Sequence, residues 1–330
     1  MQLDRRRFIT ISAAATGIVA SGTALASGRK LKPVRWQGTA LGAKASLILF
    51  HADKQRAEQI IAACVAEVDR LENIFSLYRD NSAIVRLNKS GSLTQPPPEL
   101  VEALADCRRI SEITDGAFDI SVQPLWQLFA RHFSAPEADP AGPSDKDIAR
   151  ARKLVDYRAV HVDRNLVSLN KSRMAITLNG FAQGFITDRI TQLLRGEGLD
   201  NVLVDMGETS ALGGHPEGRP WRVGIRDPQT KDQTLRTLPL DNHAIATSGA
   251  YGMRFAGSDR FHHLFDPGTG SSSQRYASVT VMAPTAATAD ALSTALSSMS
   301  TEEAGVSLQQ AGAKAAWFLL PDGSFRDVRI

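Results

Sequence analysis

Cysteine is scarce in this chain of 330 residues, which contains only Cys64 and Cys107. Neither has other ligands at metal-binding spacing, so we do not expect a zinc site. The two cysteines could pair in an oxidising compartment, but each lies on the apolar face of a predicted helix. Burial as small hydrophobic residues is therefore the better interpretation.

The sequence also lacks an excess of charge of either sign. Residues 1–26 hold three of the 38 basic and one of the 35 acidic residues, so residues 27–330 carry a formal charge of only +1. Nucleic acid and membrane surfaces are therefore poor candidates as partners. After the N-terminal segment no apolar run approaches the length of a membrane span, so we expect a soluble mature protein.

Several common motifs are absent. No G-x-G-x-x-G sequence opens a helix after a first strand, which excludes a Rossmann-type flavin site. No G-x-S-x-G sequence surrounds Ser248, which argues against a serine hydrolase. There is no internal repeat, heptad pattern or low-complexity tract. The hydrophobic content of 43% is enough for one large core or two modest ones.

The N-terminal segment is typical of an export signal. Three arginines at residues 5–7 precede a weakly apolar stretch at residues 9–20 and an Ala-Leu-Ala sequence at residues 24–26. This pattern predicts a twin-arginine signal peptide over residues 1–26 and a periplasmic mature protein over residues 27–330. Because this route exports folded proteins, a cofactor bound in the cytoplasm could travel with the chain.

Apolar spacing predicts amphipathic helices over residues 55–75 and 99–113. Residues 134–147 contain three prolines and are expected to form a surface loop. Further helices are predicted at residues 182–195, 286–298 and 301–311. Predicted strands occupy residues 174–178, 201–205, 221–226, 244–247, 278–283 and 315–320. Because these elements mix without a regular βαβ rhythm, the sequence favours an α+β fold.

Two segments have the composition of a phosphate site. Residues 177–184, Thr-Leu-Asn-Gly-Phe-Ala-Gln-Gly, lie between a predicted strand and a predicted helix. Backbone N–H groups at a helix start suit a phosphate, and glycine lets a ligand approach the backbone. A tight turn without a ligand explains this segment equally well. Residues 247–249, Thr-Ser-Gly, could line the same pocket or simply end a strand.

Two further segments carry candidate catalytic and metal-binding groups. On a strand, His262 and His263 would face opposite sides, so they cannot chelate one metal together, although one could be a general base. A lone histidine is more often structural. Asp290 and Thr294 share one helix face with Ser293 beside them, and three hard oxygen donors suit Mg²⁺. A simple i,i+4 hydrogen bond is the alternative for this segment alone.

Taken in order, these segments resemble the ApbE family, the FAD:protein FMN transferases. The resemblance covers nearly all of residues 27–330, from Gly-Thr-Ala-Leu-Gly at residues 38–42 to the last strand. It includes Phe-Ser-Leu-Tyr-Arg at 75–79, Asp-Gly-Ala-Phe-Asp at 115–119, Gly-Phe-Ala-Gln-Gly at 180–184, Ala-Thr-Ser-Gly-Ala-Tyr at 246–251, His-Leu-Phe-Asp-Pro at 263–267 and Ala-Asp-Ala-Leu-Ser-Thr-Ala-Leu at 289–296. It implies one ApbE-like domain with T-fold-like mixed sheets packed with helices.

The resemblance also implies roles for individual residues. The implied FAD contacts are Leu41, Tyr78, Ala117, Phe118, Asp119, Thr177, Gln183 and Leu264. The implied Mg²⁺ ligands are the Gly180 carbonyl, Asp290, Ser293 and Thr294. The implied base is His263, which would take a proton from a threonine of the acceptor protein. That oxygen would attack the FMN phosphorus and release AMP, with the metal neutralising the pyrophosphate.

Three positions depart from the family pattern. Family members usually carry Asp where this chain has Thr177, Lys or Glu where it has Gln183, and Gly-Gly where it reads Gly207-Glu208. The first two changes remove charges, so a non-catalytic FAD carrier or maturation factor is an alternative, and an FAD pyrophosphatase is another. The Asn-Gly-Phe-Ala-Gln-Gly and Met-Gly-Glu versions resemble the NosX-type subgroup of nitrous oxide respiration. This implies the periplasmic flavin domain of a membrane electron-transfer protein as the acceptor.

Overall fold

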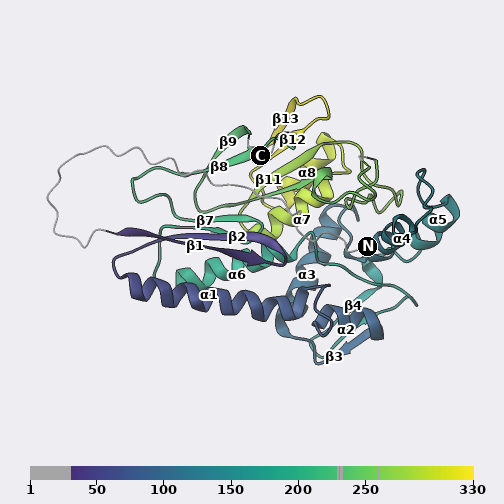
Figure 1. The fold of residues 1–330 in the computed structure, drawn as a ribbon, viewed down its shortest axis with the longest axis horizontal. Coiled ribbons are helices and arrows are strands. Elements are labelled where there is room, and N and C mark those ends of the chain that lie inside the picture. Colours follow the sequence, from purple (N-terminus) through teal and green to yellow (C-terminus); the bar gives the residue numbers. More distant parts are fainter. Residues whose placement is uncertain (1–30, 229, 231–232, 259) are drawn as a thin grey trace.

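A computed structural model of the chain describes residues 31–228, 230, 233–258 and 260–330 (Figure 1). The predicted signal peptide lies outside the described residues. The largest element in the described part is an eight-stranded sheet in which all neighbouring strands are antiparallel. Its strands, in spatial order, are β1 (Lys32–Ala40), β2 (Ala43–His51), β6 (Val202–Asp205), β7 (Thr209–Leu212), β10 (Ala244–Gly249), β11 (Ser278–Ala283), β12 (Ala315–Leu319) and β13 (Phe325–Arg329).

The main hydrophobic core lies between one face of this sheet and a layer of helices. Figure 1 shows α1 and α6 running along β1 and β2. The helices of this layer are α1 (Lys54–Phe75), α3 (Pro98–Ile113), α6 (Ala182–Gly196), α7 (Ala286–Leu296) and α8 (Thr301–Gln310). The other face packs on the hairpin of β8 (Trp221–Arg226) and β9 (Thr234–Leu240). Leu47 and Leu49 therefore face the helices, whereas Ile48 between them faces the hairpin.

A smaller part of the chain packs at one end of the helical layer. There a cluster of buried aromatic side chains, including Phe129, Phe255 and Phe265, holds α4 against the loops that follow β10. The remaining helices are α2 (Ala83–Ser90), α4 (Gln123–Phe133) and α5 (Asp145–Arg152). The remaining strands, β3 (Ser92–Thr94), β5 (Leu166–Leu169) and β4 (Val160–Val162), form a three-stranded antiparallel sheet in that order.

Most of the predicted elements are confirmed. Every predicted helix, and every predicted strand except the one at residues 174–178, is present with ends within two residues of the expectation. The α+β fold is confirmed, with a large antiparallel sheet. Cys64 and Cys107 are buried and free, as the apolar faces of α1 and α3 predict. None of the helices in the described part of the chain combines the length and apolar character that a membrane crossing needs.

Two local predictions are wrong. Residues 174–178 form no strand, because their backbone groups bond elsewhere: the Asn88 amide bonds both the N–H and the carbonyl of Ile176 at 2.8 Å, and the Thr177 N–H donates to the Ile120 carbonyl. The loop predicted to extend to residue 147 ends earlier. Ser144 caps α5, which begins at Asp145, by accepting the Asp147 N–H at 3.2 Å.

Candidate active site

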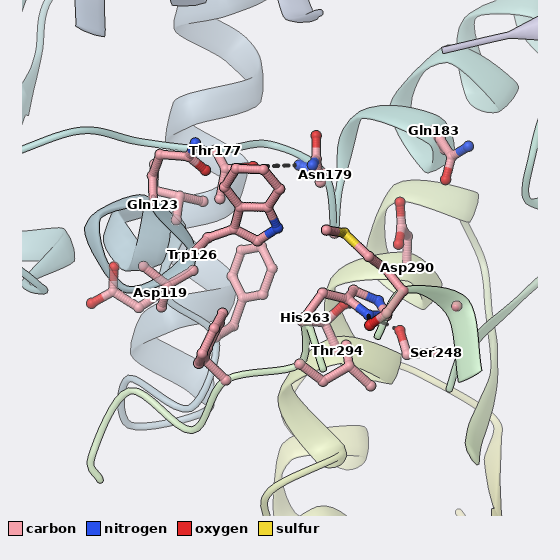
Figure 2. A pocket seen from close by; sticks show the side chains of 18 of the residues that line it. Asp119, Gln123, Trp126, Thr177, Asn179, Gln183, Ser248, His263, Asp290 and Thr294 are labelled. Carbon is pink, nitrogen blue, oxygen red and sulfur yellow. Dashed lines mark hydrogen bonds between the residues drawn. The ribbon is translucent and has the colours of Figure 1, made fainter. Parts of the chain in front are cut away.

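A cavity, partly open to solvent, lies where the start of α4, the turn before α6, the end of β10 and α7 meet (Figure 2). Residues 263–265 and Pro267 form part of its wall. All the predicted site residues except Leu41 and Ser293 line this cavity. Those brought together are Tyr78, Ala117, Phe118, Asp119, Thr177, Gly180, Gln183, His263, Leu264, Asp290 and Thr294.

Leu41 and Ser293 are not among the residues that line the cavity. Leu41 occupies the turn between β1 and β2 with a positive φ of 48°, and its N–H donates to Glu72 Oε1 at 2.5 Å. Ser293 is fully buried. Its hydroxyl bonds the Asp290 carbonyl at 2.9 Å and the Ser248 hydroxyl at 2.7 Å. Ser293 thus ties α7 to the end of β10, and its oxygen is engaged within the protein.

The oxygen donors predicted for a metal lie on α7 and on the turn before α6. Asp290 is 4% exposed, and its Oδ2 accepts the Gly184 N–H at 3.1 Å. The Thr294 hydroxyl lies 3.2 Å from that of Ser248. A Cβ atom on Gly180 would lie 2.7 Å from Thr294 Oγ1, so glycine is what allows the turn to approach this hydroxyl.

Two contacts lock α6 against α7 and so fix the position of the donors. A Cβ on Gly184 would lie 2.6 Å from the Ala286 carbonyl carbon, so the two helix starts touch through this glycine. Asp188 of α6 accepts the N–H groups of Ala286 and Ala287 at 2.7 and 2.8 Å, which satisfies the start of α7. Burial raises the pKa of Asp188 to about 6.

The N–H groups at the start of α6 are themselves partly engaged. Ala182 donates to the Leu178 carbonyl at 2.7 Å, and Gly184 donates to Asp290. The positive end of this helix therefore holds a protein carboxylate, which can in turn hold a cation. This differs from a helix start whose free N–H groups bind phosphate directly, which is one of the two interpretations that the sequence of residues 177–184 left open.

His263 has the properties of a general base. Its Nδ1 lies 3.2 Å from the Met253 carbonyl oxygen. Because a carbonyl only accepts, Nδ1 carries the hydrogen and Nε2 keeps a lone pair. Burial lowers the pKa of His263 to about 4, so the ring is neutral at physiological pH. A neutral imidazole with an available Nε2 on a cavity wall can accept a proton.

The neighbouring His262 is structural. It is 1% exposed, its Nε2 lies 2.6 Å from the Ser273 carbonyl, and its Nδ1 accepts the Leu264 N–H at 3.3 Å. Both ring nitrogens are therefore used. The two histidines do not lie on a regular strand; only His262 pairs, in an isolated bridge with Arg254. The hydrogen bonds thus separate the roles that the sequence left open.

Aromatic side chains form the wall opposite the α7 donors. Figure 2 shows Trp126 and Asp119 on the α4 side of the cavity and Asp290, Thr294 and His263 on the other. The Trp126 indole makes an edge contact with Phe255, with ring centroids 6.2 Å apart. A flat aromatic wall suits stacking of a flavin or adenine ring.

Tyr78 and Trp126 also border a second hollow, which shares Gln123 and Asn179 with the cavity. Lys89 and Arg173 also line this second hollow.

Asp119, an implied FAD contact, has a structural task in the chain itself. It caps the 3₁₀ helix Ile120–Val122, and its Oδ1 accepts both the N–H and the hydroxyl of Ser121 at 2.7 and 2.6 Å. Its Oδ2 accepts the Tyr157 N–H at 2.9 Å. Burial raises the pKa of this carboxyl despite these bonds. Asp119 therefore shapes the loop that carries Phe118 and leads into α4, the helix of Trp126.

The cavity lining is acidic. Among the described residues that line it there is no lysine or arginine, but there are three carboxyl groups, those of Asp119, Glu208 and Asp290. Burial raises the pKa of Asp290 to about 7. Burial, and then the carboxylates of Asp290 and Asp205, raise the pKa of Glu208 well above its ordinary value. No positively charged side chain of this lining would compensate a pyrophosphate, so a cation would have to accompany it.

Glu208 is a charged cavity residue to which the sequence assigned no role. It follows β6, at the position noted only as a departure from the family's Gly-Gly. Its place in the cavity results from the packing of β6 on α6, which in turn packs on α7. The one available signal was a charged residue directly after an apolar strand and a glycine.

The donor set fits a divalent cation. Asp290, Thr294 and the Gly180 carbonyl are hard oxygen donors of the kind that Mg²⁺ uses, usually with few protein ligands plus phosphate and water. Among the described residues no group of three or more His, Cys, Asp or Glu side chains forms a complete metal cage. Two buried carboxyls without a basic partner line the same cavity, and a cation would compensate both.

Comparison with known proteins agrees with this geometry. The sequence profile of the ApbE family matches residues 41–318. The FAD:protein FMN transferase of Salmonella typhimurium is 29% identical over 301 residues, which cover 87% of this chain and 84% of that protein. The enzyme of the same name from Escherichia coli K12 is 32% identical over 265 residues, 76% of this chain and 74% of that one. The crystal structure of the ApbE protein from Thermotoga maritima matches with a TM-score of 0.78 and 28% identity, over 90% of this chain and 97% of that chain.

The match of the profile over most of the chain shows that this protein belongs to the ApbE family. The structural match extends the relationship to the whole arrangement of sheet and helices. The comparisons do not separate subgroups of the family, so the NosX-type assignment stays a prediction.

Proposed function

We propose that this chain transfers FMN from FAD to a threonine of an acceptor protein through a phosphodiester bond, with release of AMP. Membership of the family, and relatives named FAD:protein FMN transferase, support the reaction. The observation that carries the proposal for this chain is one cavity with a neutral His263 on its wall and the Asp290–Thr294 donor pair on α7.

Each of these residues has a separate role in the proposed reaction. His263 Nε2 takes the proton of the acceptor hydroxyl, while Met253 holds the ring through Nδ1. The oxygen so released forms a bond to the FMN phosphorus, and the bond from that phosphorus to the AMP oxygen breaks. Trp126 and Tyr78 offer faces on which the ring systems of FAD can stack.

Asp290, Thr294 and the Gly180 carbonyl would hold Mg²⁺. When bound, this ion supplies neutralisation of the pyrophosphate charge. The chain needs this help because no basic side chain of the described residues lines the cavity. Thr177 and Gln183, which are uncharged, also line it. The positive charge that stabilises the reaction must therefore come mainly from the ion.

We further propose that the protein acts in the periplasm after export by the twin-arginine route. The arginines at residues 5–7 and the cleavage pattern at residues 24–26 support this. The acceptor is then the periplasmic flavin domain of a membrane electron-transfer protein, and the Met-Gly-Glu sequence at residues 206–208 favours one of nitrous oxide respiration. Replacing Arg5 and Arg6 by lysine should retain the protein in the cytoplasm, as cell fractionation would show.

The test of the reaction is the intact mass of a candidate flavin domain after incubation with the mature protein, FAD and Mg²⁺. A gain of one FMN that disappears when the acceptor threonine is changed to valine supports the transferase. His263→Ala should retain FAD binding and lose the transfer. Tight FAD binding without any mass gain, over several acceptors, would favour the carrier. Release of FMN and AMP without an acceptor would favour the pyrophosphatase.

A further inference from the structure

Glu208 differs from the other buried carboxylates of this protein in how its oxygens are used. Asp188 bonds two N–H groups, one through each oxygen, and both oxygens of Asp119 accept hydrogen bonds. Glu208 is only 5% exposed, yet its Oε2 is buried without any hydrogen-bond partner. A buried carboxylate oxygen left unpaired is costly, so an interaction absent from the protein itself is expected there.

The backbone around Glu208 is held firmly, so the position of its side chain is not accidental. The Glu208 carbonyl accepts the Met206 N–H and the Thr187 hydroxyl, both at 3.1 Å. Gly207 has a positive φ of 106°, and a Cβ there would lie 2.5 Å from the Gln183 amide. The turn after β6 can therefore pack against α6 only with glycine at residue 207, and this packing directs the next side chain into the cavity.

Asp290 is the charged residue with the largest electrostatic effect on Glu208. Both carboxyls line the cavity, and the Asp290 carboxylate is the leading charge that raises the pKa of Glu208. The hydrogen bond from Gly184 reaches only Oδ2 of Asp290. The cavity thus holds two adjacent buried carboxyls with unused oxygens, next to the Thr294 hydroxyl and without a basic side chain among the described lining residues.

We propose that Glu208 is a second carboxylate ligand, beside Asp290, of a divalent cation in this cavity. The inference rests on the proposed metal-dependent function and adds to it a residue and an order of binding. Two carboxylates match the charge of a dication, so the cation binds the protein before FAD arrives. With Asp290 as the only charged ligand, the phosphates of FAD would have to complete the site.

The test measures binding of Mn²⁺ to the full-length mature protein in the absence of FAD, by electron paramagnetic resonance of the free ion. The wild type should bind one ion. Glu208→Gln should weaken this binding by about tenfold or more, because it removes one of the two charges. Glu208→Asp, which keeps the charge on a shorter side chain, should bind with intermediate affinity.

Asp205→Asn is the matched control. Asp205 lies in the same turn and is largely buried, but its side chain accepts the Gly207 N–H at 3.1 Å and does not line the cavity. This variant should lose far less Mn²⁺ affinity than Glu208→Gln, because Asp205 acts on the site only as a nearby charge and not as a ligand. A chelator-treated sample gives a second readout: Glu208→Gln should melt at or above the wild type, because the two carboxylates no longer repel, and at a given Mg²⁺ concentration its melting temperature should rise by less than that of the wild type.

The outcomes separate the two proposals. Equal Mn²⁺ affinity of Glu208→Gln, Glu208→Asp and wild type would overturn the role of Glu208 and leave the proposed reaction intact. If the wild type bound Mn²⁺ only when FAD is present, the role of Glu208 would also be overturned and the proposed reaction would again be left intact. If the wild type bound no divalent cation with or without FAD, the metal-dependent function itself would fail. If Glu208→Gln does not fold, the Glu208→Asp affinity decides.

Discussion

Removing the charge of Asp290 should stabilise the metal-free protein at alkaline pH. The pKa of this carboxyl is raised from 3.8 to about 7 by burial, so the folded state holds its proton more tightly than the unfolded state. Stability from this group is therefore present at low pH and is lost as pH rises from about 4 to about 7. A shift of this size corresponds to a loss of about 4 kcal/mol on full ionisation.

Asp290→Asn removes the loss of folding stability that ionisation of this carboxyl causes. The asparagine oxygen can still accept the Gly184 N–H, so the main cost of the substitution is small. At pH 8 with chelator, we expect the variant to exceed the wild type by about 2–4 kcal/mol in free energy of unfolding. The difference should shrink towards zero near pH 4. Urea denaturation at pH 4.5, 6 and 8 measures it.

Two controls make the prediction specific. Asp188→Asn should gain little or no stability at pH 8, because its new NH₂ group would face an N–H of Ala286 or Ala287 and this cost offsets the relief of the buried charge. Added Mg²⁺ should stabilise the wild type and leave Asp290→Asn unchanged. An Asp290→Asn protein that is less stable than the wild type at pH 8 without metal would refute the reasoning about this carboxyl.

Three further predictions follow from the same geometry. His263→Gln should lower the transfer rate by about 100-fold or more at pH 7.5. For the wild type, kcat/KM should decrease only when the pH approaches about 4, the pKa of His263, which a pH profile at saturating Mg²⁺ tests. Gly184→Ala should lower the free energy of unfolding by about 2 kcal/mol, because the new methyl group would overlap Ala286. Gly196→Ala on the same helix should not lower it, because the space around Gly196 is open, and urea denaturation of both variants measures the difference. Trp126→Ala should weaken FAD binding by about tenfold, seen as a loss of affinity in flavin fluorescence titration, and Trp126→Phe by less.

Elements with one strongly buried face could be predicted from the sequence. In α1 the apolar residues recur at helical spacing from Ile60 to Phe75, and the predicted helix is confirmed. The hairpin of β1 and β2 was not predicted. Every residue of β1 except Ala40 is exposed or only partly buried, so its apolar signal is weak, and β6, the other partner of β2, lies far along the chain.

The site could be predicted in part, because its motifs are local but its geometry is not. The sequence could name His263 and Asp290 through short motifs that resemble a family. It could not decide between His262 and His263 by physical reasoning, since the decision depends on carbonyls contributed by Ser273 and Met253. Glu208 was missed for the same reason: its burial and its unpaired oxygen exist only after three elements meet.

The order of strands in the large sheet has a consequence for when the protein can fold during its synthesis. β2 pairs with β6, and the cavity takes residues from Tyr78 to Thr294, so neither is complete until most of the chain has left the ribosome. Contacts between such distant parts of the sequence close slowly. A transport route that threads unfolded chains would carry this protein before its ligand pocket existed. The proposed route for folded proteins allows the pocket to form, and to fill, where FAD is made.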